Sequence, residues 1–212
     1  MKRYIYLFRH GETDANKNDI YQGKRVNPPL NEKGKMQVRF LAEFMATNYP
    51  KISTVVFSPA LRTLQTAIEV ARCVNARIVV ENNLHEIDHG DWEGKTSEEI
   101  GIEYPELSKK WWNGVNPLEI EFPNGEKIKD AIKRVRTAFF ETLEKHQDEH
   151  LAISAHGGTN SIILGEILGA QNFRSIGQSN TALNIIRQKN GIFRVKLMNG
   201  TAHLLKSIKS TS

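Results

Sequence analysis

Short apolar runs alternate with amphipathic stretches along most of the chain. Four runs have the length of buried strands, and they cover residues 4–8, 53–57, 77–80 and 151–155. Between the runs, apolar residues recur at three- and four-residue steps, the spacing of a helix that buries one face. This order of strand, helix and strand predicts an α/β fold with a mostly parallel central sheet.

The predicted helices cover about residues 31–49, 59–74, 126–146 and 158–168. Asn31 is expected at the start of the first, and Ser58 is expected to cap the second, with Pro59 at its first helical position. The basic residues of the third, Arg134 among them, are expected on its solvated face. Near the end of the chain, apolar runs at 181–187 and 193–197 flank an Asn-Gly turn, which predicts a hairpin of antiparallel edge strands.

Charged and polar residues follow three of the predicted strands. Arg9 and His10 come directly after the first strand, and His156 follows the fourth in the same way. Arg62 falls in the first turn of the helix that follows the second strand. Because ligands of open α/β sheets bind beyond the carboxyl ends of the strands, we expect these four side chains to converge. The first strand end, taken alone, fits a strand followed by an ordinary polar loop equally well.

Two arginines and two histidines in one place predict an anion site. The arginine guanidinium group matches phosphate oxygens, and helix N-termini add amide donors. Histidine can also form a covalent intermediate, for which its imidazole must be neutral. Neighbouring arginines favour the neutral form by repelling the imidazolium. The bound group is therefore expected to be a phosphoryl group.

These residues also carry a resemblance to a known family. The strings LFRHGETDANKN, YQGK, PLNEKGKMQ, SPALRTLQTA, LHEIDHGDWEG and SAHGG, from residue 5 to about residue 160, resemble the histidine phosphatase superfamily. The phosphatases of its phosphoglycerate mutase-like, cofactor-independent branch are the most similar. The resemblance implies a three-layer α/β sandwich with a small irregular or helical cap insertion around residues 96–125, in a single domain that spans residues 1–212.

The resemblance also implies roles for individual residues. His10 would be the nucleophile that forms a phosphohistidine, and Arg9, Arg62 and His156 would hold the phosphoryl oxygens. Glu86 would be the general acid, which protonates the leaving oxygen and later activates water.

Five further positions would bind substrate. Asn16 would help bind phosphate, Gln22 and Gly23 would lie near the substrate entrance, and Gly157 would offer a backbone donor. His89 matches a histidine that lies close to substrate in metal-independent phosphoserine phosphatases of the superfamily; as a plain sequence feature it fits a surface loop residue just as well.

Two positions around the cap bear on substrate choice. Trp111 and Trp112 would either wall a pocket or, as is commoner, form the core of the small insertion. Lys127 replaces the serine of the family's P-x-G-E-S segment, which puts any substrate contact of that serine in doubt.

Composition limits the partners and the cellular location that can be expected for the protein. The net charge of +5 and pI near 9.3 come from scattered basic residues, so no nucleic-acid partner is expected. Cys73 lies beside valines in a predicted helix and is expected to be buried. No signal peptide or membrane span is recognisable, so a cytoplasmic protein without a membrane partner is expected. A homodimer is possible through a sheet edge near the hairpin.

The leading hypothesis is a phosphatase, with no metal and no cofactor, that hydrolyses a small phosphorylated metabolite through phosphohistidine. Phosphoserine is the first substrate to consider; α-ribazole phosphate, sugar or acid phosphates and phosphoglycerate mutase chemistry are the rivals. A non-catalytic phosphate-binding protein is a further alternative. The ionisable residues of segment 84–94 raise a metallohydrolase as a third class, although they lack a helix-spaced ligand motif.

Overall fold

The computed structural model describes residues 2–113, 116–170 and 172–208, and its central element is one six-stranded sheet. The strands are β1 (Lys2–Arg9), β2 (Thr54–Phe57), β3 (Arg77–Val80), β4 (His150–Ala155), β5 (Leu183–Lys189) and β6 (Ile192–Gly200). Their order is β3-β2-β4-β1-β5-β6. The first four strands in this order pair in parallel, whereas β5 pairs antiparallel with both β1 and β6. The predicted mostly parallel sheet with an antiparallel edge is confirmed.

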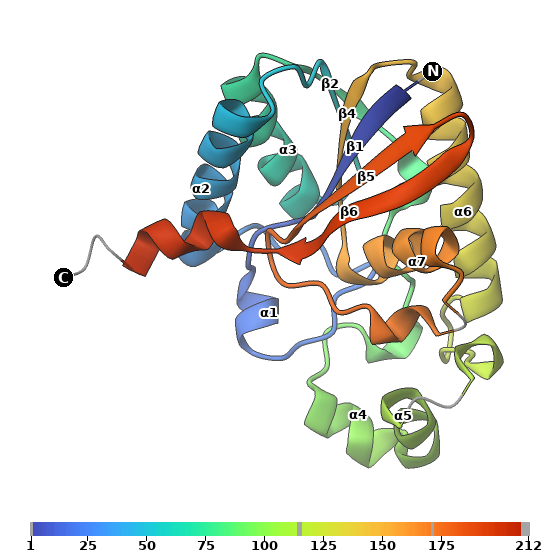
Figure 1. The fold of residues 1–212 in the computed structure, drawn as a ribbon. Helices are drawn as coiled ribbons and strands as arrows, with labels where there is room; N and C mark the ends of the chain where they lie inside the picture. The colour runs from blue at the N-terminus through green and yellow to red at the C-terminus, as the bar shows by residue number, and fades with distance from the viewer. Residues whose placement is uncertain (1, 114–115, 171, 209–212) are drawn as a thin grey trace.

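Helices cover both faces of this sheet, which gives three layers (Figure 1). The α-helices are α1 (Asp14–Lys17), α2 (Glu32–Asn48), α3 (Leu61–Val74), α4 (Ser97–Glu103), α5 (Pro105–Trp112), α6 (Ile128–Lys145) and α7 (Gly157–Leu168). Short 3-10 helices are η1 (Asn82–Leu84), η2 (Gly90–Trp92), η3 (Pro117–Glu119), η4 (Phe173–Ser175) and η5 (Ala202–Ile208). None of the helices formed by the described residues combines the length and apolar character needed to cross a membrane.

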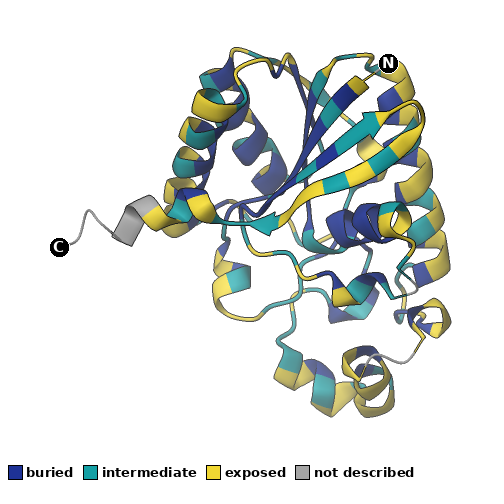
Figure 2. Cartoon of the chain, in the orientation of Figure 1, coloured by how far each residue is buried: buried dark blue, intermediate teal, exposed yellow. Residues whose placement is uncertain are grey.

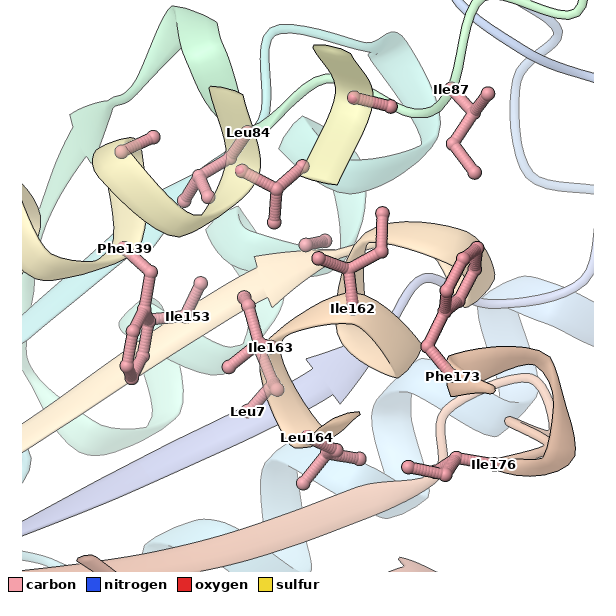
Figure 3. Close-up of a cluster of buried hydrophobic side chains, with 14 of the residues drawn as sticks. Leu7, Leu84, Ile87, Phe139, Ile153, Ile162, Ile163, Leu164, Phe173 and Ile176 are labelled. Carbon is pink, nitrogen blue, oxygen red and sulfur yellow. The ribbon is translucent and has the colours of Figure 1, made fainter. Parts of the chain in front are cut away.

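The side-chain alternation of β1 divides the core in two. Tyr6 and Phe8 pack with α2 and α3, whereas Ile5 and Leu7 pack with α6 and α7. Figure 3 shows Leu7 in the second cluster, among apolar side chains of β4, α6 and α7. Buried positions face the sheet and exposed positions face outward along these helices (Figure 2). Burial on both faces holds the strand ends at fixed positions.

The ends of two helices bear on the site. Asn31 caps α2 as predicted, since its side chain accepts a hydrogen bond from the Gly34 amide. The prediction for Ser58 was wrong: α3 begins at Leu61, and Ala60 is its N-cap residue without a side-chain bond. Cys73 is partly buried and packs against the apolar cluster on the α2 and α3 side of the sheet, so its predicted burial is found only in part.

The hairpin and the insertion complete the fold. Asn190 and Gly191 form the turn between β5 and β6, both with positive φ (50° and 77°), as an Asn-Gly hairpin requires. Figure 1 shows α4 and α5 at the lower end of the molecule. Trp111 is 8% exposed and belongs to the core, whereas Trp112 is 41% exposed. One domain with a cap-like insertion at about 96–125 stays a prediction, and residues 114–115 of that segment lie outside the described residues.

Candidate active site

Adjacent strand ends bring the predicted arginines and histidines together. β1 and β4 pair with Arg9 opposite Ala155, so His10 and His156 leave neighbouring strands at the same level. Their ring centroids are 5.4 Å apart in an edge-to-face arrangement. Arg62 lies in the first turn of α3, which follows β2, the other neighbour of β4. The predicted convergence of these strand ends is therefore found in the structure.

The imidazole of His10 is held by its own backbone neighbour. Its Nδ1 lies 2.7 Å from the carbonyl oxygen of Gly11. Because a carbonyl only accepts hydrogen bonds, Nδ1 carries the proton in the neutral ring and Nε2 keeps its lone pair. Burial lowers the pKa of His10 well below its usual value, and the charges of Arg62 and Arg9 lower it further. The ring is therefore neutral at neutral pH, and the lone pair of Nε2 is available.

His156 is also buried, and it contacts a partner that the sequence did not reveal. Its Nε2 lies 2.6 Å from Oγ of Ser58, and its Nδ1 is buried without a hydrogen-bond partner among the described residues. Burial first, then the charge of Arg62, lowers the pKa of His156 well below its usual value. The only sequence signal for Ser58 is its place at the end of β2, beside β4. The hydroxyl of Ser58 therefore contacts His156 and does not cap α3.

The two arginines are anchored by carbonyl groups and keep donors free. Nη2 and Nη1 of Arg62 donate to the carbonyls of Gly23 (3.0 Å) and Val26 (3.2 Å), and Nη1 of Arg9 donates to that of Gln178 (2.7 Å). Nε of each arginine is buried with no partner within the described ranges. Burial lowers the pKa of Arg62 to about 10, so it stays charged at neutral pH. Arg62 is buried and Arg9 is partly buried, and two such cations with unused donors are suited to a dianion.

Glu86 approaches this pocket from the loop after η1 and contacts the start of α7. Its Oε2 accepts a hydrogen bond from the amide of Gly158 (2.9 Å), and its Oε1 accepts one from that of Thr159 (3.0 Å). These amides belong to the first turn of α7, where the helix dipole favours a carboxylate. Glu86 also lines two hollows, one of about 420 Å³ beside Gly23 and one of about 200 Å³ beside Gly157.

Glu93 fixes the loop that holds Arg62. Its carboxylate accepts hydrogen bonds from three successive amides of residues 24–26, at 2.8 to 3.0 Å. A Cβ added at Gly23 would lie 2.1 Å from Oε1 of Glu93, so a larger residue does not fit there. Gly23 thus contributes a carbonyl to Arg62 and leaves room for Glu93. The sequence placed Glu93 only among the ionisable residues of segment 84–94.

Arg134 supports the Glu86 loop, which corrects the prediction that it belongs to a solvated face. Its Nη1 donates to the carbonyls of Asn83 and His85, at 2.7 and 3.0 Å. Its Nε and Nη2 form a two-bond ion pair with Glu126, and both side chains are only 15% exposed. Glu126, eight residues earlier in the chain, and the two carbonyls supply the hydrogen-bond partners that let Arg134 be largely buried.

Asn16 and Gln22 lie beside the site without touching its arginines. The hydroxyl of Thr13 lies within hydrogen-bond distance of Oε1 of Gln22 (2.8 Å) and of Oδ1 of Asn16 (3.1 Å), and Oδ1 of Asn16 accepts a hydrogen bond from Asn180. Asn180 in turn donates to the carbonyl of His10. Asn16 lines a separate open cleft of about 730 Å³. In this structure the two residues therefore order the backbone around His10, and direct binding of phosphate by Asn16 stays a prediction.

His89 is a buried cavity residue, so the reading of it as a surface loop residue was wrong. It is 7% exposed, and its ring packs edge-on against Phe122 (4.8 Å between centroids) and Tyr21 (5.4 Å). It lines the 200 Å³ cavity together with Glu86, Gly157 and Trp111. Trp111 is thus both part of the core and part of a cavity wall. Within the described residues, no group of three or more histidine, cysteine or carboxylate side chains is placed to hold a metal ion.

Known proteins share this fold and these motifs. The model of the histidine phosphatase superfamily (branch 1) matches residues 5–201. Phosphoserine phosphatase 1 of Hydrogenobacter thermophilus is 30% identical over 202 residues, 94% of this chain and 93% of that protein. The uncharacterized phosphatase PhoE of Bacillus subtilis is 29% identical over 206 residues, 97% of this chain and 98% of that protein. The solved structure of Bacillus stearothermophilus YhfR superimposes with a TM-score of 0.87 at 27% identity, covering 95% of this chain and 99% of that one.

Proposed function

The chain belongs to the histidine phosphatase superfamily and is a phosphatase, and from that premise we propose that it hydrolyses a small phosphate monoester through a phosphohistidine on His10. The observation that carries this proposal is the orientation of His10: its Nδ1 is bound to the Gly11 carbonyl, which leaves Nε2 free beside the guanidinium groups of Arg62 and Arg9. Neutral Nε2 is the atom that attacks phosphorus.

The reaction has two displacements at phosphorus. In the first, Nε2 of His10 forms the N–P bond while the P–O bond to the alcohol breaks, and protonated Glu86 gives its proton to the leaving oxygen. In the second, ionised Glu86 takes a proton from water, the water oxygen bonds to phosphorus, and the N–P bond breaks. Arg9, Arg62 and His156 donate hydrogen bonds to the phosphoryl oxygens in both steps. The step needs no metal or cofactor.

Phosphoserine is the substrate that we propose to test first. The relatives named phosphoserine phosphatase cover almost the whole chain, which supports this choice. Sugar and acid phosphates, α-ribazole phosphate and phosphoglycerate are the alternatives. A panel of these esters, with free phosphate as the readout, ranks them by kcat/KM. Analysis of the phosphoglycerate products by NMR distinguishes hydrolysis from mutase transfer.

The decisive test of the mechanism uses His10→Ala and labelled substrate. The wild-type enzyme, mixed with a ³²P-labelled ester and quenched in base, should retain an acid-labile phosphoryl group on the protein. His10→Ala should retain none and lose turnover while its unfolding temperature stays close to that of the wild type. Vanadate should inhibit and EDTA should not. The matched control is His150→Gln, at the opposite end of β4, which should keep both label and turnover. Substantial turnover in His10→Ala would remove His10 from the mechanism.

Two further expectations concern the protein as a whole. We propose a cytoplasmic location, and a homodimer formed through β6, which is an edge strand of the sheet. Sedimentation equilibrium distinguishes a monomer from a dimer, and a Pro substitution in the outer half of β6 should then weaken a dimer that uses this edge.

A further inference from the structure

Arg174 places an unpaired positive charge in the wall of the 200 Å³ cavity. Its guanidinium carbon lies 3.7 Å from the centroid of the Trp111 ring. Its Nη1 is buried without a hydrogen-bond partner, and no carboxylate of the described residues forms an ion pair with it. The residue as a whole is only partly buried, but a buried donor without a partner is costly unless a ligand accepts its hydrogen bond.

The surface on which Arg174 stacks is itself fixed. Nε1 of Trp111 donates to the hydroxyl of Tyr21 (3.2 Å), and Nε1 of Trp112 donates to the same oxygen (3.1 Å). This arrangement holds the Trp111 ring from its polar edge, so the ring face toward Arg174 has a defined position. Cation–π stacking then orients the guanidinium group before any ligand binds.

The cavity connects Arg174 with the reacting groups. Glu86, the proposed acid, and Gly157, which adjoins the Arg9 side chain, line the same cavity. His89 lines it as well, and its Nδ1 is buried without a partner in the part of the chain that the structure describes. A leaving group whose ester oxygen faces Glu86 therefore extends toward two unused polar groups. The volume is below the ~300 to 1,000 Å³ of pockets for drug-sized ligands, so the leaving group must be small.

We infer that Arg174 determines specificity by binding a carboxylate on the leaving group of the substrate, with His89 beside it. This inference rests on the proposed function and deepens it, because it restricts the substrates to small phosphate esters of hydroxy acids. The guanidinium fork matches a carboxylate with two parallel hydrogen bonds. The pairing also neutralises the charge of Arg174 in the cavity wall, which a neutral alcohol would leave unpaired.

The test compares esters that differ only in the carboxylate. 3-Phosphoglycerate is paired with glycerol 3-phosphate, and p-nitrophenyl phosphate reports the basal reaction. Arg174→Met keeps an apolar stem over Trp111 and removes the charge. We expect kcat/KM for 3-phosphoglycerate to fall by about 10- to 100-fold, the effect of losing hydrogen bonds to a charged group. The values for the two other esters should change by less than about threefold. Arg174→Lys, which keeps the charge without the fork, should recover part of the loss.

The matched control is Arg136→Met, which removes an exposed arginine of α6 and should leave all three values unchanged. Equal losses of Arg174→Met on esters with and without the carboxylate would overturn the inference, as would a wild type that prefers glycerol 3-phosphate. Each of these results leaves phosphohistidine chemistry standing. A wild type that hydrolyses none of the esters would instead overturn the proposed function, and this inference with it.

Discussion

Backbone groups provide most of the hydrogen bonds that orient His10 and Glu86, the proposed nucleophile and acid; the hydroxyl of Thr159 adds one to Glu86 at 3.3 Å. His10 is fixed by the carbonyl of the next residue, and Glu86 by two amides of α7 that lie more than 70 positions further along the chain. The distance between nucleophile and acid therefore depends on where the first turn of α7 lies. A change of one atom in that turn is expected to alter the chemistry.

Gly158 and Gly157 provide a matched test of this dependence. A Cβ at Gly158 would lie 2.6 Å from Oε1 of Glu86, whereas a Cβ at Gly157 would make an ordinary 3.6 Å contact with Arg9. Gly158→Ala should displace the carboxylate and lower kcat on an alkyl phosphate by about 100-fold, the cost of a misplacement near 1 Å. Gly157→Ala should lose less than about tenfold. Steady-state kinetics on both variants checks this, and equal losses would contradict it.

Sequence reasoning could find Arg9, His10 and His156 because each directly follows an apolar run, and a strand end is visible locally. It could not find Ser58 or Arg174 as site residues. The contact of Ser58 with His156 joins positions 98 apart in the chain, and its hydroxyl looks like a helix cap until that partner is known. The cavity position of Arg174 depends on Trp111, from a different element.

At the scale of elements, the loop of residues 23–26 positions Arg62, and Glu93, from the segment after η2, positions that loop. The carbonyls of Gly23 and Val26 bind Arg62, and the amides of residues 24–26 bind Glu93 at the end of η2. Hydrophobic periodicity predicts the helices and strands well but carries no information on such loops. The same limit applies to Arg134, whose helix was predicted and whose ion pair was not.

Glu93→Gln tests whether this arrangement matters for phosphoryl binding. The amide keeps the shape but turns one acceptor into a donor that faces backbone N–H groups, so the loop should loosen around Arg62. We expect the inhibition constant of vanadate and KM to rise by about tenfold, with a smaller change in kcat, because one anchored donor loses its position. Glu103→Gln, which breaks an exposed ion pair with Lys95, is the control. A lowered unfolding temperature with unchanged vanadate inhibition would show that Glu93 stabilises the fold only.

Four of the seven histidines of the whole molecule are buried. His10, His89, His156 and His203 are each at most 7% exposed, and burial is the main cause that lowers the pKa of every one. Three of them surround the site, and the fourth lies on η5, where Nε2 contacts Oγ1 of Thr181 at 3.0 Å. These four histidines therefore bind protons more readily when the chain is unfolded than when it is folded.

The stability of the protein should consequently fall between pH 7 and pH 5. The unfolded histidines, with pKa near 6.5, take up protons in this range while the folded ones remain neutral, so acid favours the unfolded state. Carboxylates held in ion pairs take up protons only at lower pH, so the change in stability between pH 7 and pH 5 reports mainly on the histidines. Burial lowers the pKa of His203 to about 4; His203→Phe should therefore remove on the order of 1 to 2 kcal/mol of the pH-dependent loss, because this histidine takes up a proton above pH 5 only when the chain is unfolded. Urea unfolding at pH 7 and pH 5 measures the pH-dependent loss in both proteins, and an unchanged loss in the variant would show that folding does not shift the pKa of His203.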